Sequence, residues 1–203
     1  MPLSEAREAH LARLFAPDST FPTDAPDDAP DDADGTNAGD AFDDFFRRTR
    51  GAALVVDTNV LLDLYYWKDP RSVELREAIE AGRLVPVRDR ASVRELAEVL
   101  DRPRFGLEFD AVSAILEAWC QRALPVPEVL VEEAGRKLRE KRILCRDPLD
   151  QKFLDLAAAA RALGLVTKDK LVLRAGKKLA RLGVKTTLPE DVATILERAP
   201  KTF

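Results

Sequence analysis

The chain has 203 residues, of which 46% are hydrophobic and 33% are charged, and its formal net charge is −4. This length is enough for one domain with a sizeable core. No apolar run approaches the roughly 18 residues that would indicate a membrane span, and the acidic, polar N-terminus is unlike a secretory signal. We therefore expect a globular protein of the cytoplasm that has no contact with a membrane.

The counts of histidine and cysteine limit the chemistry that the chain can perform. His10 is the only histidine, so catalysis by a His–Ser or His–Cys pair is disfavoured. Cys120 and Cys145 lie far apart, with no second Cys or His at the spacing of a zinc site. We expect both cysteines to be reduced thiols.

Charge divides the chain into an acidic leader and a mildly basic body. Residues 1–50 contain twelve acidic residues and five arginines, whereas the remainder contains 24 acidic and 27 basic residues. Apolar residues near one helical face predict a short helix within residues 1–16. Residues 17–50 are expected to form a disordered linker, because the ten aspartates of its acidic stretch leave little apolar surface to bury. Residues 51–203 form the predicted domain.

From residue 51 onwards, short apolar runs alternate with segments of helical periodicity. Strands are predicted at residues 52–56, 83–87 and 165–167, with a further strand at 184–187 and a brief one within 123–127. Helices are predicted at residues 58–67, 71–82, 91–100, 107–122, 128–144, 148–164, 169–179 and 189–199. Such alternation favours an α/β fold with a parallel sheet between two layers of helices.

Four acidic residues stand at the ends of predicted strands or on the helices beside them: Asp57, Glu95, Asp150 and Asp169. In a parallel sheet, ligands lie beyond the carboxyl ends of the strands, so these side chains are expected to reach one crevice. Carboxylate oxygens suit Mg²⁺ or Mn²⁺, which favours a metal-dependent phosphodiesterase. The alternative for each residue is a structural one, in which the carboxylate caps a helix or offsets its dipole.

Four segments resemble, in order and spacing, the acidic motifs of PIN domains: VVDTNVLLDL, RELAEVL, CRDPLDQKFLDLA and LVTKDKLVL. The resemblance covers about residues 52–190 and includes the VapC-like toxin components of type II toxin–antitoxin systems. It implies a Rossmann-like three-layer α/β/α fold and an endoribonuclease that uses Mg²⁺ or Mn²⁺. It also implies that the metal ligands and catalytic residues are Asp57, Glu95, Asp150 and Asp169.

The resemblance extends to polar residues around this quartet. Asn59 and Thr167 fall on positions that support it. Asp147 competes with Asp150 for the third position, and we prefer Asp150 because the apolar residues after it stand at the family's spacing. Asp147 would then cap a helix or act outside the metal ligands. Phosphates that flank the cut are expected to contact basic residues near the site, namely Lys168, Lys170, Arg88, Arg90, Arg102 and Arg104.

The sequence therefore predicts a metal-dependent endoribonuclease with RNA as its substrate. From the resemblance we also expect a toxin role, a cognate antitoxin and a homodimer. Two alternatives remain open: a module that binds RNA or protein without cutting, and a PIN nuclease of RNA processing without a toxin role. The first is favoured by Lys168 and Lys170, which flank Asp169, because family members commonly have glycine before the last acid and a second acid two residues after it. A nucleotide-binding Rossmann role is disfavoured, since the chain has no GxGxxG or GKS/T loop.

Overall fold

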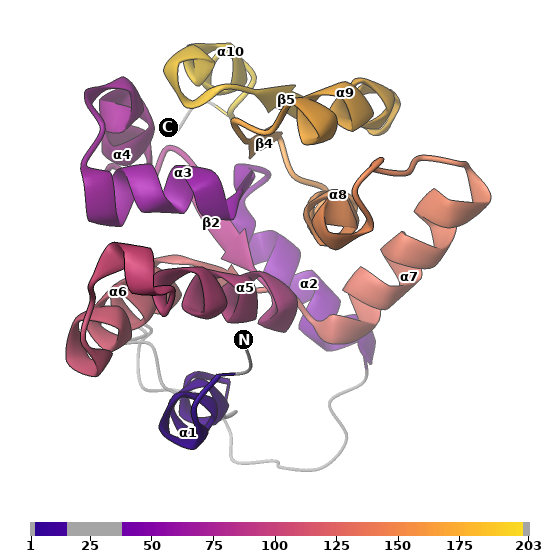
Figure 1. Ribbon diagram of the computed structural model, residues 1–203. Helices are drawn as coiled ribbons and strands as arrows, with labels where there is room; N and C mark the ends of the chain where they lie inside the picture. Colours follow the sequence, from indigo (N-terminus) through magenta and orange to yellow (C-terminus); the bar gives the residue numbers. More distant parts are fainter. Residues whose placement is uncertain (1–2, 16–37, 201–203) are drawn as a thin grey trace, which may run out of the picture.

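The structure is a computed structural model that describes residues 3–15 and 38–200. Its centre is a sheet of five parallel strands in the order β3-β2-β1-β4-β5 (Figure 1). The predicted α/β fold with a central parallel sheet is confirmed. In chain order the strands are β1 (Ala53–Val56), β2 (Val85–Arg88), β3 (Leu124–Pro125), β4 (Gly164–Val166) and β5 (Lys185–Thr187).

Helices connect the strands and cover both faces of the sheet. The α-helices are α1 (Glu5–Leu14), α2 (Ala38–Thr49), α3 (Thr58–Leu62), α4 (Val73–Glu80), α5 (Arg90–Leu100), α6 (Phe109–Arg122), α7 (Glu128–Glu140), α8 (Gln151–Ala159), α9 (Lys170–Leu179) and α10 (Ala193–Leu196). Shorter segments are the π-helical η1 (Asp63–Trp67) and the 3₁₀ turns η2 (Pro70–Ser72), η3 (Pro103–Phe105), η4 (Pro148–Asp150), η5 (Ala180–Leu182) and η6 (Pro189–Asp191).

Alternation along the central strand β1 produces two hydrophobic cores, one on each face of the sheet. Leu54 and Val56 belong to the core that α1, α3, α4, α5, α6 and α10 cover. Ala53 and Val55 point the other way, into the core that α2, α7, α8 and α9 cover. All four side chains are buried, as expected for a strand with helices on both sides. The predicted three-layer α/β/α arrangement is therefore confirmed.

The strand order creates a switch point in the middle of the sheet. The chain proceeds from β1 to β2 and β3 on one side, and then returns to place β4 and β5 on the other side of β1. β1 and β4 pair directly, with Val56 opposite Val166. Connections leave these two strands toward opposite sides, which opens a crevice beyond their carboxyl ends. Asp57 and Thr167 are the next residues of the two strands.

The predicted linker is wrong over its last part, because residues 38–49 form helix α2. Phe45 is 5% exposed in the core behind the sheet, and Phe46 packs against the same core. The two rings meet edge to face at 5.3 Å, and the guanidinium of Arg161 lies 4.5 Å from the Phe46 ring. The linker was predicted from the average composition of the acidic stretch, which does not show that Phe45 and Phe46 pack against the core. Residues 17–37 of the predicted linker lie outside the described residues.

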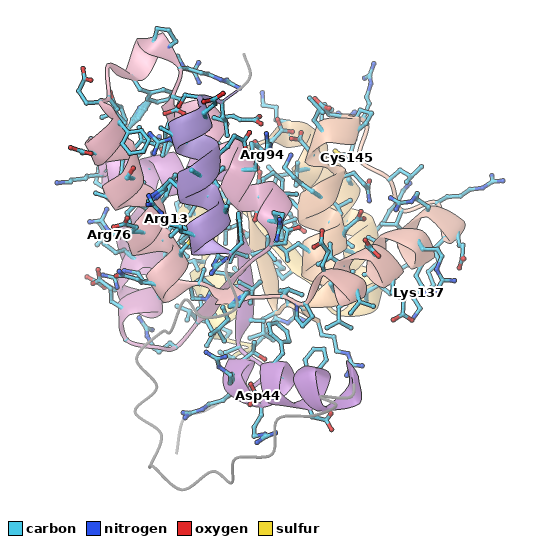
Figure 2. The ribbon with its side chains drawn as sticks, turned by 90° about the horizontal axis from the view of Figure 1, so that it is seen from below. Arg13, Asp44, Arg76, Arg94, Lys137 and Cys145 are labelled. Atoms are coloured by element: carbon cyan, nitrogen blue, oxygen red, sulfur yellow. The ribbon has the colours of Figure 1, made fainter. Side chains whose placement is uncertain are left out.

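Helix α1 lies within the range predicted for a short helix and packs on α5 and α6. Leu11 is 3% exposed in the core, and Glu8 forms an ion pair of 2.5 Å with Arg94 of α5. Figure 2 shows Arg94 beside α1. Arg7 is only 1% exposed and bonds to Asp101 and Ser113, at 3.1 and 2.8 Å. The first helix is thus fixed to the domain by buried polar contacts as well as apolar ones.

The helix predicted over residues 58–67 changes its winding after Leu62 and continues as η1. Asp63 in this segment is 3% exposed, and its carboxylate meets the Lys168 ammonium at 2.6 Å. The segment ends at Lys68, whose φ of 52° lies in the left-handed region.

Cys120 and Cys145 are buried free thiols. In residues 3–15 and 38–200, no helix is both long and apolar enough to cross a bilayer.

Candidate active site

Asp57 lies at the centre of the candidate site, directly after β1, and is 4% exposed. Its Oδ2 accepts hydrogen bonds from Asn59 Nδ2 at 2.8 Å and from Thr167 Oγ1 at 2.5 Å. Its Oδ1 accepts a longer bond of 3.4 Å from the Asn59 amide, so the carboxylate also caps α3. The structural role and the predicted site role therefore fall on the same side chain.

Thr167 connects the first and last motifs. It is fully buried, and its hydroxyl donates to Asp57 while accepting from the Asp169 amide at 2.9 Å. Asn59 makes a second connection, because its Oδ1 accepts from the Lys168 amide at 3.0 Å. These bonds lock the loop after β1 to the loop after β4. The polar residues predicted to support the site thus hold its two central loops together.

Asp169 follows Thr167 by two residues and caps α9. Its Oδ1 accepts from the amides of Leu171 at 2.6 Å and Val172 at 3.1 Å. These bonds fix one carboxylate oxygen at the start of a ten-residue helix. A carboxylate at this end of a helix is also favoured by the helix dipole. The second oxygen takes no part in the cap.

Asp150 and Asp147 differ in how their side chains are used. Asp147 Oδ1 accepts from the Leu149 amide at 2.9 Å and so caps the turn η4. Asp150 stands at the start of α8 but makes no side-chain capping bond. Burial raises the pKa of Asp150, and the charges of Asp147, Asp169 and Glu95 raise it further. Asp150 is thus the member of this pair whose carboxylate is not occupied in a cap.

Glu95 reaches the site from α5 and pairs with a cation that the sequence analysis did not identify. Its Oε2 lies 2.5 Å from Lys152 Nζ, and both side chains are mostly buried. Lys152 also donates to the Leu149 carbonyl. Lys152 lies in the first turn of α8, where a positive charge is disfavoured by the helix dipole. This unfavourable position, two residues after Asp150, was the signal in the sequence that Lys152 has an acidic partner.

Charge effects show that the four predicted carboxylates share one neighbourhood. Burial raises the pKa of Asp57 to about 6, and Glu95 and Asp150 add to the rise, while the bonds from Thr167 and Asn59 oppose it. The pKa of Asp150 responds in turn to Asp169 and Glu95. Repulsion of this kind is relieved when a cation binds between the carboxylates.

Oxygen donors of this type fit Mg²⁺ or Mn²⁺ chemically. As the side chains stand, the part of the chain that the structure describes contains no group of three His, Cys, Asp or Glu positioned around one ion. Asp57 and Asp169 are held by their bonds to the loops and to α9, and Glu95 is held by Lys152. The donor chemistry therefore fits the ion, and the carboxylates influence one another's pKa without converging on one point.

Two of the basic residues predicted to contact phosphates are already used within the fold. Arg88 is 3% exposed and donates to the Ala123 carbonyl at 3.2 Å, so it does not present its charge to solvent. Lys168 is half-buried and pairs with Asp63. The sequence does not show which basic residues find acidic or carbonyl partners, so these two contacts were not predicted.

The other four predicted basic residues are exposed: Lys170, Arg90, Arg102 and Arg104. Arg90 begins α5, and Lys170 begins α9 directly after Asp169. Arg102 and Arg104 lie at η3, beyond the far end of α5, where the Arg104 guanidinium is 4.8 Å from the Phe105 ring. The carboxyl side of the sheet therefore keeps Arg90 and Lys170 beside the acidic cluster.

Comparison with known proteins agrees with this arrangement. The family model described as "PIN domain" matches residues 53–171, which is more than half of the chain. The match includes all four predicted carboxylates and both loops that Thr167 and Asn59 connect. No curated protein and no solved structure matches the chain significantly.

Proposed function

Because the chain belongs to the PIN domain family, whose members are generally nucleases, we propose that it is a Mg²⁺- or Mn²⁺-dependent endoribonuclease. The observation that carries this proposal is the gathering of four mutually repelling carboxylates at the carboxyl edge of the sheet: Asp57, Glu95, Asp150 and Asp169. Repulsion between these carboxylates lowers the stability of the folded protein when no cation is bound. A catalytic ion that binds among them would account for their position.

The ion would be held by Asp57, Asp150 and Asp169, with Glu95 as a further ligand or as the group that orients water. When bound, it would lower the pKa of its water and neutralise charge on the scissile phosphate. Asn59 and Thr167 fix the orientation of Asp57, since both donate to the same oxygen. Asp147 supports the turn that carries Asp150, because its bond to Leu149 shapes η4.

Two basic residues near the cluster would contact the RNA backbone. Lys170 follows Asp169, and Lys152 holds Glu95 from the opposite helix. Ammonium groups at these positions would attract phosphates that flank the cut and oppose charge build-up during attack. A protonated amine that already neighbours the acidic cluster needs little rearrangement to act there.

Within this function we propose that the protein is the toxin component of a toxin–antitoxin pair in the cytoplasm, with RNA as substrate and a cognate antitoxin and a second copy as partners. The support is the resemblance of the four motifs to VapC-like proteins. A second candidate is a non-cutting RNA- or protein-binding module. It is favoured by one observation: Asp169 is engaged as a helix cap between two lysines.

The test is cleavage of a panel of labelled RNAs by the wild type and by Asp57→Asn in Mg²⁺, Mn²⁺ or EDTA. We expect cleavage that requires the ion and that falls by a factor of at least about 1,000 in the variant. Asp110→Asn is the matched control, because this exposed aspartate lies in the first turn of α6. RNA that is bound but not cut would favour the second candidate. Growth arrest on expression, relieved by Asp57→Asn, would support the toxin role.

A further inference from the structure

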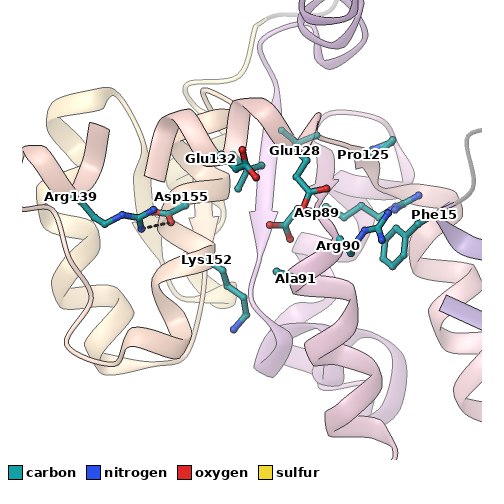
Figure 3. A pocket seen from close by; sticks show the side chains of 13 residues that line it. Phe15, Asp89, Arg90, Ala91, Pro125, Glu128, Glu132, Arg139, Lys152 and Asp155 are labelled. Atoms are coloured by element: carbon teal, nitrogen blue, oxygen red, sulfur yellow. Dashed lines mark ion pairs between the residues drawn. The ribbon is translucent and has the colours of Figure 1, made fainter. Parts of the chain in front are cut away.

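A cavity of about 350 Å³ lies at the carboxyl edge of the sheet, and Figure 3 shows the side chains that line it. Arg88 and Asp89 from the end of β2 line it together with Pro125 and Val126 from the end of β3. Asp57 and Thr167 follow the neighbouring strands β1 and β4. Because all these strands are parallel, the cavity and the carboxylates form one continuous band along their carboxyl ends.

Lys152 contacts both the cavity and the acidic cluster. Its side chain lines the cavity, and its ammonium contacts Glu95 at 2.5 Å. A phosphate in the cluster would therefore lie close to the mouth of the cavity. The nucleotide attached to that phosphate is the part of a substrate that could enter it. A volume of this size is at the lower end of that of ordinary ligand pockets.

An aromatic wall comes from outside the matched PIN segment. Phe15, at the end of α1, lines the cavity, and Figure 3 shows its ring against Arg90. The Arg90 guanidinium lies 5.1 Å from the ring centroid, and that of Arg88 lies 5.6 Å away. α1 is held in place by Arg7 and Leu11, so the ring is carried by a fixed element. Rings and guanidinium planes are the surfaces on which unpaired RNA bases stack.

Charge decides which part of a nucleotide suits the cavity. Four acidic residues line it against four basic ones, and two of these acids are placed by the fold. Asp89 caps α5 by accepting from Ser92, and Asp155 pairs with Arg139 at 3.5 Å. The carboxylates accept hydrogen bonds from the N–H groups of a base, and the arginines donate to its carbonyl oxygens and ring nitrogens. A lining of balanced charge that offers donors and acceptors suits a neutral base, and the phosphate would meet the Lys152 ammonium, which contacts Glu95 of the acidic cluster.

We propose that this cavity binds the base of a single-stranded RNA nucleotide next to the scissile phosphate, with the base stacked on Phe15. The proposal rests on the proposed function for the position of the scissile phosphate. It adds a contact that the PIN segment alone does not supply, because Phe15 belongs to the N-terminal helix. Base pairing would keep a nucleotide out of the cavity, so double-stranded RNA would be a poor substrate.

The test uses a fluorescein-labelled single-stranded 12-mer RNA in which each nucleotide in turn is replaced by an abasic riboside. Binding to the full chain carrying Asp57→Asn is measured by anisotropy, and cleavage by the wild type is measured in parallel. We expect one abasic position to weaken binding about tenfold, since stacking of a base is worth roughly 1–3 kcal/mol. Phe15→Ala should weaken binding of the intact RNA by a similar factor and remove the effect of that abasic position.

Two further variants separate stacking from a general loosening of α1. Phe15→Tyr keeps the ring and should bind like the parent. Arg94→Ala breaks the ion pair between α5 and α1 but does not line the cavity, so we expect a change of less than about twofold. A full abasic effect that persists in Phe15→Ala, or an equal loss in Arg94→Ala, would overturn the proposal.

The outcomes for this proposal and for the nuclease are distinguishable. RNA cleavage that is insensitive to abasic substitution and to Phe15 would overturn the base site alone. Phe15-dependent binding without cleavage would support the base site and count against the nuclease. A chain that binds none of the RNAs would overturn both.

Discussion

Asp57 is ionisable, buried and close to two other carboxylates, and its folded environment opposes its charge. In the unfolded chain its pKa is near 3.8, whereas in the fold it is raised to about 6. The folded protein therefore binds this proton more tightly than the unfolded chain does. Its contribution to the free energy of unfolding is fully present below about pH 4 and is lost as the pH rises through about 6.

Replacing Asp57 by Asn should make the ion-free protein more stable at neutral pH. A shift of about two pKa units corresponds to about 3 kcal/mol, and part of it is offset because one hydrogen bond to Thr167 or Asn59 weakens. We expect the variant to gain about 2 kcal/mol at pH 7.5 in EDTA and to show a smaller fall in stability between pH 4 and 6. Urea unfolding at several pH values measures both. Equal pH profiles for the two proteins would contradict the raised pKa.

Individual acidic residues gave an ambiguous signal in the sequence, because the same position suits a helix cap and a metal ligand. Asp147 and Asp150 stand three residues apart, and one caps a turn while the other makes no cap. Asp57 and Asp169 cap helices and are also members of the proposed metal site. A helix start at the carboxyl end of a strand needs a cap at the same place where a metal site needs a ligand. The structural and functional readings of these positions are therefore compatible.

Helix α1 illustrates how one element is fixed by a single buried charge. Arg7 contacts Asp101 with two nitrogens, the Ser113 hydroxyl and the Phe109 carbonyl, and its guanidinium lies 4.2 Å from the Phe109 ring. Asp101 is partly exposed, so solvent can replace part of what it loses when Arg7 is removed. The bond to Ser113 is buried and has no such replacement.

Arg7→Met should therefore lower the free energy of unfolding by about 2–3 kcal/mol and release α1 from α6. Guanidinium unfolding gives the first quantity, and limited proteolysis reports the release. Arg13→Met is the matched control, because Arg13 is exposed on the same helix and should change stability by less than about 0.5 kcal/mol. Protection of α1 from protease in Arg7→Met would show that apolar contacts such as Leu11 suffice.

At the scale of the whole molecule, the proposed site draws its residues from all parts of the matched segment. Asp57 follows β1, Glu95 belongs to α5, Asp150 to η4 and Asp169 to the loop before α9. The proposed ion would bind these elements only when they are folded together. A ligand that binds only the folded state raises its stability by mass action.

Mn²⁺ at a concentration 100-fold above its dissociation constant should stabilise the protein by about 2.7 kcal/mol, which corresponds to a rise in Tm of roughly 5–10 °C for a chain of this size. Differential scanning fluorimetry in MnCl₂ and in EDTA measures the shift. Asp150→Asn should lose most of it, whereas Asp110→Asn should retain it. A shift of the same size in all three proteins would indicate ion binding elsewhere.

Much of this protein could be predicted from local patterns. Each predicted strand and helix depends on periodicity, turns and caps within about a dozen residues, so the alternation of elements and the parallel sheet followed from the sequence. The four carboxylates were predicted to form one site because strand ends meet at one edge in a parallel sheet. The polar partners Asn59 and Thr167 came from the motif resemblance, and their bonds to Asp57 agree with it.

Only the tertiary structure decided which charged and aromatic side chains become partners when the two residues lie far apart in the sequence. Lys152 pairs with Glu95, Lys168 pairs with Asp63, and Arg88 is buried. Phe15 lines a cavity whose other lining residues belong to the PIN segment. α2 forms because Phe45 and Phe46 find apolar partners behind the sheet. Periodicity records which face of an element is apolar, but ion pairs and cavities depend on how whole elements pack. That packing joins residues up to about a hundred positions apart.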